Sequence, residues 1–201
     1  MKAILIAGGN VSDYDKLYIN ENDYVICADS GYDRAKKLGI IPDVVIGDMD
    51  SVKSTEIKSE KIVYPTRKDY TDSELIMEYA KNNGFDELIL LGFIGTRMDH
   101  TITNLSLLLN YSESDAVIIN ENNEIRLARD KNIIKGKKGD IVSIIPFGGD
   151  LRGIFTHNLE YTLKNENLYL GFGRGVSNVM TSDECTITIE SGKGLIIKSR
   201  D

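Results

Sequence analysis

The stretch Val44-Val45-Ile46-Gly47-Asp48-Met49-Asp50-Ser51 decides how this chain is interpreted, because an apolar run stops at a glycine and two carboxylates follow. Side chains two residues apart in an extended chain point the same way, so Asp48 and Asp50 can converge on one point. If the run is a buried parallel strand, that point lies where open α/β sheets bind ligands. A divalent cation would relieve the repulsion between the two acids. The alternative is a solvated turn in which Asp50 or Ser51 caps the next helix.

The chain before residue 123 alternates short apolar runs with helix-like segments, as a parallel α/β sheet requires. Thr71 and Glu74 have the spacing of a capping box at the start of one helix, and Gly39 has the position of a C-cap. The predicted strands are residues 3–7, 24–28, 43–46, 61–64, 87–91 and 116–119, and the predicted helices are residues 32–38, 72–84 and 99–110. We therefore expect a three-layer α/β domain with a mostly parallel sheet over residues 1–122.

The pattern changes after a polar stretch at residues 120–123, which suits a linker. Short β-type runs separated by glycine, asparagine and charged turns follow, and no amphipathic helix pattern interrupts them. The predicted strands are residues 125–128, 141–146, 159–163, 168–170, 186–190 and 195–198. So many short strands predict a small all-β sandwich domain over residues 123–201.

Composition excludes some classes of protein. The 201 residues are 41% hydrophobic and 27% charged, and the net charge is -7. The chain has no block rich in lysine and arginine, which argues against a nucleic-acid-binding surface. Without a bilayer-length apolar stretch or a signal-peptide pattern, we expect a cytoplasmic protein. Cys27 and Cys185 lack metal-ligand spacing and are expected to be buried free thiols.

More acids lie where predicted strands end. Asp29 follows one strand, Asp72 begins a helix, and Asp99 follows another strand. The carboxyl ends of parallel strands gather at one edge of a sheet, so acids that are distant in sequence can become neighbours. Each acid also has a structural alternative. Asp29 suits a turn, Asp72 suits the dipole of its helix, and Asp99 suits an N-cap.

Two cations accompany these acids. Lys68 and Arg97 suit phosphate oxygens, with surface salt bridges as the alternative. Acids that suit Mg²⁺ beside cations that suit phosphate indicate phosphoryl or pyrophosphoryl transfer from a nucleoside triphosphate. No P-loop motif occurs, and Gly8-Gly9-Asn10 lacks the spacing of a dinucleotide fingerprint. We expect His100 to be structural rather than catalytic.

A series of motifs carries a resemblance that covers nearly the whole chain. In order they are ADSG (28–31), PDVVIGDMDS (42–51), KDYTD (68–72), GTRMDH (95–100) with Asn104 one turn on, LEYTL (159–163) and GVSN (175–178). Their order and spacing resemble those of the thiamine pyrophosphokinase (thiamine diphosphokinase) family, bacterial type. The resemblance implies an α/β domain followed by a β-sandwich in a homodimer, with thiamine between the α/β domain of one subunit and the sandwich of the other. The reaction it implies moves the pyrophosphoryl group of ATP to the thiamine hydroxyl, giving thiamine diphosphate and AMP.

The resemblance also implies roles for individual residues. The residues that would hold Mg²⁺ and the triphosphate are Asp29, Asp48, Asp50 and Asp72. The remaining ATP-side residues are Lys68, Asp69, Thr71, Arg97 and Asn104, while Asp99 would contact thiamine or orient its hydroxyl. The catalytic residues would be Asp48, Asp50, Asp72, Arg97 and Asp99. From the partner subunit, Tyr161, Ser177 and Asn178 would bind thiamine.

The sequence departs from the family pattern at two positions in the motifs that the resemblance assigns to thiamine binding. Gly175 occupies the first serine position of the family's S-x-S-N motif, and Tyr161 replaces a tryptophan found in some members. Two other functions stay open. One is pyrophosphoryl transfer to a different hydroxymethyl heterocycle such as a pterin, which acceptor competition would reveal. The other is a nucleotide- or thiamine-sensing module, which would bind without releasing AMP.

Overall fold

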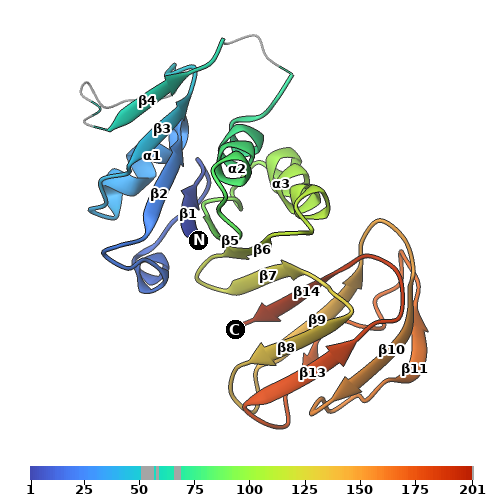
Figure 1. The fold of residues 1–201 in the computed structure, drawn as a ribbon. Helices are drawn as coiled ribbons and strands as arrows, with labels where there is room; N and C mark the ends of the chain where they lie inside the picture. The colour runs from blue at the N-terminus through green and yellow to red at the C-terminus, as the bar shows by residue number, and fades with distance from the viewer. Residues whose placement is uncertain (51–56, 58, 66–68, 201) are drawn as a thin grey trace. The chain divides into compact units, whose positions relative to one another are not determined.

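The computed structural model describes residues 1–50, 57, 59–65 and 69–200 (Figure 1). Within it the chain divides into two units, Met1–Glu121 and Asn122–Asp201. Lys68 and Ser51, both part of the predicted motifs, lie outside the described residues, so their roles stay predictions.

A parallel sheet forms the centre of the first unit. Its strands are β1 (Lys2–Ile6), β2 (Tyr24–Ala28), β3 (Val44–Gly47), β4 (Glu60–Val63), β5 (Glu87–Leu91) and β6 (Asp115–Ile119). Their order is β6-β5-β1-β2-β3-β4, and every neighbouring pair is parallel. The chain moves outward from β1 to β4 and then returns to the other side of β1. The point where the strand order reverses therefore lies between β1 and β5, the place where such sheets bind ligands.

In the part of the chain that the structure describes, three α-helices and one short 3-10 helix accompany this sheet. They are η1 (Asp13–Tyr18), α1 (Asp29–Lys37), α2 (Asp72–Asn82) and α3 (Met98–Asn110). Figure 1 shows α1 and α2 on opposite sides of β1–β3. Tyr32 and Ala35 of α1 join the core cluster that contains Ile4 and Val25, because alternate strand residues project to one face. The predicted mostly parallel α/β architecture is confirmed.

The predicted helix boundaries are close to those observed. The capping box of α2 is present: the Glu74 N–H donates to Thr71 Oγ1 at 3.2 Å, and the Thr71 N–H donates to Glu74 Oε2 at 2.7 Å. Gly39 follows α1 with φ +75°, the left-handed conformation that favours glycine at a helix end. The helix predicted from residue 32 in fact begins at Asp29, so Asp29 lies inside the first turn of α1.

The second unit consists of antiparallel strands. They are β7 (Asn123–Leu127), β8 (Lys131–Lys135), β9 (Ile141–Pro146), β10 (Leu151–His157), β11 (Lys164–Leu168), β12 (Asn178–Val179), β13 (Glu184–Thr188) and β14 (Gly194–Ser199). They form two layers, ordered β12-β9-β14-β7 and β11-β10-β13-β8. Both layers contribute to one apolar cluster, for example Ile144 and Ile196 from the first and Ile154 and Ile187 from the second. The predicted β-sandwich is confirmed.

Two predictions in the second unit are wrong. Residues 159–163 form a turn between β10 and β11 rather than a strand, and of residues 168–170 only Leu168 belongs to β11, as its last residue. Leu159 and Leu163 are buried while Tyr161 between them is exposed, so the period-two burial pattern of a strand is absent. Strand β10 was not predicted, because Gly153, at φ +62°, lies where the register between β10 and β11 shifts. Such a bulge interrupts the period-two pattern.

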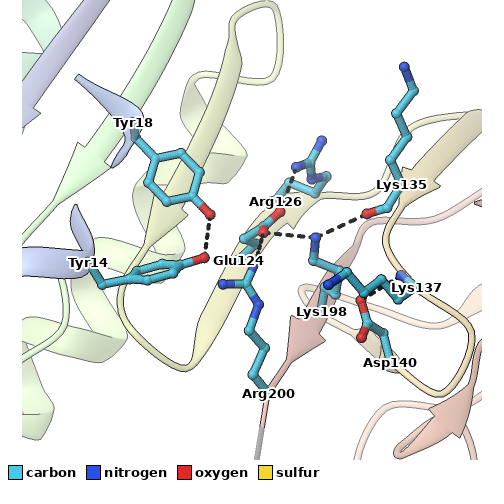
Figure 2. Close-up of polar contacts among 9 residues, drawn as sticks. All are labelled: Tyr14, Tyr18, Glu124, Arg126, Lys135, Lys137, Asp140, Lys198 and Arg200. Atoms are coloured by element: carbon cyan, nitrogen blue, oxygen red, sulfur yellow. Dashed lines mark hydrogen bonds and ion pairs between the residues drawn. The ribbon is translucent and has the colours of Figure 1, made fainter. Parts of the chain in front are cut away.

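Charged side chains link the strands at one end of this unit (Figure 2). Lys198 of β14 is only 8% exposed, and its Nζ donates to Glu124 Oε1 at 2.8 Å and to the Lys135 carbonyl at 3.0 Å. Glu124 also pairs with Arg200 at 3.0 Å and with Arg126 at 3.7 Å. A buried ammonium is tolerated only when it is paired, so this cluster ties β14 to β7 and β8.

Two further features are the state of the cysteines and the length of the helices. Cys27 and Cys185 are buried and free, as predicted. Burial raises the pKa of both thiols, that of Cys185 to about 11. Among the helices of the described residues, none has the length and apolarity needed to cross a membrane.

Candidate active site

A cavity of about 340 Å³ lies beside the carboxyl ends of β1 and β5, and we call it the strand-end cavity. Its wall comes from the loops after these two strands and from the first turns of α1, α2 and α3. Helix N-termini carry partial positive charge and unpaired N–H groups. The cavity therefore suits an anionic ligand, at the point where the strand order reverses.

Close backbone contacts shape this cavity and explain several glycines. A Cβ at Gly9 would lie 2.4 Å from the carbonyl oxygens of Gly92 and Ile94. A Cβ at Gly31 would lie 1.9 Å from the Ile6 carbonyl oxygen. The glycines of the Gly8-Gly9 loop and of the ADSG motif thus let loops and a helix pack directly on the strand ends.

Three of the predicted acids converge, and we call Asp29, Asp48 and Asp50 the three-acid cluster. One carboxylate oxygen from each lies within 4.8 Å of the others. The convergence of Asp48 and Asp50 comes from a turn and not from an extended chain. Met49 between them has φ +64°, and the Asp50 N–H donates to Asp48 Oδ1 at 3.3 Å. The alternative in which Asp50 caps a following helix depends on residues 51–56, outside the described part.

Asp29 is the buried member of this cluster. Its exposed fraction is 0%, and glycine is required at Gly47 because a Cβ there would lie 2.8 Å from the Asp29 Cβ. The Ser30 N–H donates to Asp29 Oδ1, whereas Oδ2 is buried and has no hydrogen-bond partner among the described residues. Burial, with the neighbouring charges of Asp72 and Asp48, raises the pKa of Asp29 to about 6. A buried carboxylate oxygen beside two further carboxylates fits a divalent cation.

Asp72 borders the three-acid cluster without belonging to it. It is the first residue of α2, it lines the strand-end cavity, and its charge raises the pKa of Asp29. Thr71 also lines the cavity, but its hydroxyl accepts the Glu74 N–H in the capping box. Asp69 is exposed and is not part of the cavity wall. Direct contacts of these residues with ATP or metal stay predictions.

Arg97 and Asp99 form an exposed ion pair. Arg97 Nη2 lies 2.5 Å from Asp99 Oδ2, and Nε donates to Oδ1 at 3.2 Å. Arg97, foremost through its hydrogen bond, lowers the pKa of Asp99 to about 2. The N-cap interpretation of Asp99 is wrong, because α3 begins at Met98 and Arg97 is its N-cap residue. The salt bridge weighed for Arg97 is present, although Arg97 and the exposed His100 also line the cavity.

Asn104 holds the loop after β5. Its side chain is buried, and Nδ2 donates to the Phe93 carbonyl at 2.7 Å. Sequence analysis missed Arg34 of α1, which also lines the cavity and donates from Nε and Nη2 to the Gly8 carbonyl, each at 3.2 Å. A signal was available: Arg34 follows Ser30 by one helical turn and so shares its face.

The predicted thiamine-side residues lie together in the second unit. Tyr161 is 66% exposed, and its backbone is held by the buried side chain of Asn178. The Tyr161 N–H donates to Asn178 Oδ1 at 2.9 Å, and Asn178 Nδ2 donates to the Tyr161 carbonyl at 2.8 Å. The Val179 N–H also donates to Asn178 Oδ1, at 2.9 Å. Most of the hydrogen-bonding capacity of Asn178 is thus used within the protein.

The GVSN segment is fixed on the edge of β9. The Ile144 N–H donates to the Gly175 carbonyl at 2.8 Å, and the Ser177 N–H donates to Ser143 Oγ at 3.0 Å. Ser177 has φ +58°, and its side chain is exposed. A Cβ at Gly175 would lie 2.2 Å from the Ile144 carbonyl oxygen, so the serine of the family motif has no room in this backbone.

Comparison with known protein families divides the chain at a similar point. Residues 16–119 match the model described as the catalytic domain of thiamin pyrophosphokinase, and residues 122–196 match the model of its vitamin B1 binding domain. The thiamine pyrophosphokinase of Bacillus subtilis is 29% identical over 214 residues, with full coverage of both chains. Thiamin pyrophosphokinase 1 of Caenorhabditis elegans is 29% identical over 173 residues, covering 77% of this chain and 68% of its own.

Solved structures show the same fold. The thiamine pyrophosphokinase of Bacillus subtilis superimposes with a TM-score of 0.89 at 24% identity, and each chain is covered completely. The thiamin pyrophosphokinase of Candida albicans gives a TM-score of 0.78 at 17% identity, with 99% of this chain and 89% of that chain covered. The resemblance therefore extends over both units.

Proposed function

Because the chain belongs to the thiamin pyrophosphokinase family, we propose that it transfers the pyrophosphoryl group of ATP to the hydroxyl of thiamine. The products are thiamine diphosphate and AMP. Two observations carry the proposal: the strand-end cavity, which Asp72 lines, and the three-acid cluster that the family motifs bring together. A match over both units supports the same activity.

The three-acid cluster fits the metal that such a reaction needs. Asp29, Asp48 and Asp50 would hold Mg²⁺, and Asp72 borders them at the start of α2. A cation would provide a partner for the buried Oδ2 of Asp29 and would reduce the repulsion between the carboxylates of the cluster. A bound divalent ion neutralises charge on the phosphates and so assists the departure of AMP.

The protein's own groups would bind and orient the substrates. Residues at the starts of α1, α2 and α3 line the cavity together with Arg97, and the N–H groups of these helix starts would bind an anion there. Asp99 would accept a hydrogen bond from the thiamine hydroxyl or orient it, once thiamine or phosphate competes for its pairing with Arg97. Positioning matters most here, since an alcohol is a weak nucleophile and the transition state forms little covalent bonding with the protein.

Thiamine recognition would use the second unit. Tyr161 offers an exposed ring to a flat cation, and the hydroxyl of Ser177 is exposed nearby in the GVSN motif. We propose that these residues serve the cavity of a partner subunit in a cytoplasmic homodimer. Asn178 would then support the site through its bonds to the Tyr161 backbone.

A direct assay tests the proposal. The protein is incubated with ATP, Mg²⁺ and thiamine, and AMP and thiamine diphosphate are quantified together. Equal amounts of the two products, dependent on thiamine and abolished by EDTA, are expected. Release of ADP, or absence of thiamine-dependent turnover, would refute it. Substituting a hydroxymethyl pterin for thiamine should give no product.

A further inference from the structure

Among the described residues that line the strand-end cavity, one cation, Arg34, is not part of the motifs. Arg34 lies on α1, half-buried, and lines the strand-end cavity. We propose that its guanidinium binds the polyphosphate of ATP. This role rests on the proposed pyrophosphoryl transfer and identifies a binding residue for it.

The orientation of Arg34 is already fixed. Its Nε and Nη2 both donate to the Gly8 carbonyl at 3.2 Å, which holds the guanidinium plane against the loop after β1. A guanidinium has five N–H groups, and these two bonds leave Nη1 and one hydrogen of Nη2 for a ligand. A fork of parallel donors matches two oxygens of a phosphate group. Because the side chain is already ordered, binding loses little further rotamer entropy.

The place of Arg34 in the cavity favours a phosphate partner. Ser30 lies one turn before Arg34 on α1 and lines the same wall, and the first turn of this helix adds partial positive charge. Asp72 at the start of α2 lines the same cavity, and its charge acts on Asp29 of the three-acid cluster. An anion that carries its own cation would find both Arg34 and an acid in this wall, as a metal-bound triphosphate requires.

The comparison with Arg97 sharpens the assignment. Arg97 is 70% exposed, and its guanidinium donates through two nitrogens to Asp99. To bind phosphate, Arg97 must give up or share a carboxylate partner. Arg34 instead donates to a neutral carbonyl and keeps its full positive charge for the ligand. Half-burial also weakens the solvent screening of that charge.

Equilibrium binding of ATP with Mg²⁺ tests the role without relying on turnover. We would titrate wild type, Arg34→Met and Arg34→Lys with ATP, with inorganic tripolyphosphate and with adenosine. Arg34→Met should weaken the binding of ATP and tripolyphosphate about 10- to 100-fold, since charge-assisted hydrogen bonds are lost. Adenosine binding should not change. Arg34→Lys should be intermediate, because it keeps the charge without the fork.

Lys37→Met is the matched control, an exposed cation on the same helix that does not line the cavity, and it should bind all three ligands as wild type does. ATP binding by Arg34→Met equal to wild type would overturn the proposal. So would an equal loss for adenosine and ATP, which is the result expected if Arg34 only holds Gly8. If Arg34→Met does not fold, Arg34→Lys decides by the same comparison. Wild type that binds no ATP and releases no AMP would instead contradict the proposed function itself.

Discussion

The three-acid cluster and the Tyr161–Asn178 region both contain family motifs, but they use the motif residues differently. In the cluster, Asp29 has a buried carboxyl oxygen without a hydrogen-bond partner among the described residues, and its pKa is raised. In the second region, the Asn178 amide is bonded to the backbone at Tyr161 and Val179. The acidic side chain of Asp29 is thus available to a ligand, whereas the side chain of Asn178 is used in hydrogen bonds to the protein's own backbone.

This difference teaches that a motif match does not say whether a residue touches substrate. A residue arranged for ligand binding lowers the stability of the ligand-free protein. A residue that bonds the backbone is needed for stability whether the ligand is present or not. Substitutions in the first region should therefore lower activity without lowering stability. Substitutions in the second region should lower stability.

The largest effect is expected in the three-acid cluster. Asp48→Asn should lower kcat/KM about 1000-fold, or roughly 4 kcal/mol, because a ligand of the charge-neutralising cation is lost. The melting temperature of the metal-free variant should stay the same or rise, since one of three repelling charges is gone. AMP release and thermal melting in EDTA measure both quantities. Glu113→Gln, at an exposed carboxylate outside the cavity wall, is the control. Wild-type activity in Asp48→Asn would contradict the assignment.

Asn178→Ala should show the opposite pattern. It removes the partners of the Tyr161 N–H and carbonyl and of the Val179 N–H, which should cost about 3 kcal/mol of unfolding free energy. The KM for thiamine should rise with it, because the turn that carries Tyr161 is released. Denaturant unfolding and thiamine titration measure the two effects.

Ser177→Ala is the companion variant, since the exposed hydroxyl is removed while the bond from its N–H to Ser143 remains. Its stability should stay within about 0.5 kcal/mol of wild type. Asn178→Ala with unchanged stability would remove the contrast between the two regions.

A smaller effect is expected from restoring the family serine at Gly175. The new Cβ would meet the Ile144 carbonyl oxygen at 2.2 Å, so Gly175→Ser should destabilise the protein by about 2 kcal/mol. Gly175→Ala should cost about as much, because the clash comes from the Cβ and not from the hydroxyl. Denaturant unfolding of both variants measures the loss of stability. A serine variant as stable as wild type would show that the backbone of β9 at Ile144 can shift to make room for the Cβ.

A further effect concerns pH and the metal-free protein. The pKa of Asp29 is raised to about 6 in the folded state, above the ordinary value of 3.8, so the folded state binds the proton more tightly. Stability contributed by this group is present below the unfolded pKa and is lost as pH rises toward 6. Melting temperatures in EDTA should therefore fall across this interval. Asp29→Asn should abolish that component, and an unchanged pH profile in the variant would rule out Asp29 as its source.

Sequence alone determined the order of elements in the first unit and the meeting of its acids. Apolar runs that end in glycine or aspartate predict parallel strands, and parallel strands place their carboxyl ends on one edge. Asp29, Asp48 and Asp50 follow from that rule, although the turn at Met49 does not. Local patterns suffice here because the ligand edge is a consequence of topology.

The tertiary structure decided the rest. It placed Arg34 on the cavity wall, showed that residues 159–163 form a turn, and revealed that Gly175 has no space for a side chain. It also paired Arg97 with Asp99 and bonded Asn178 to Tyr161. These features depend on which backbone atoms approach across long stretches of chain. Periodicity and motif spacing describe neighbours along the sequence, so contacts between distant segments become visible only when the chain is folded.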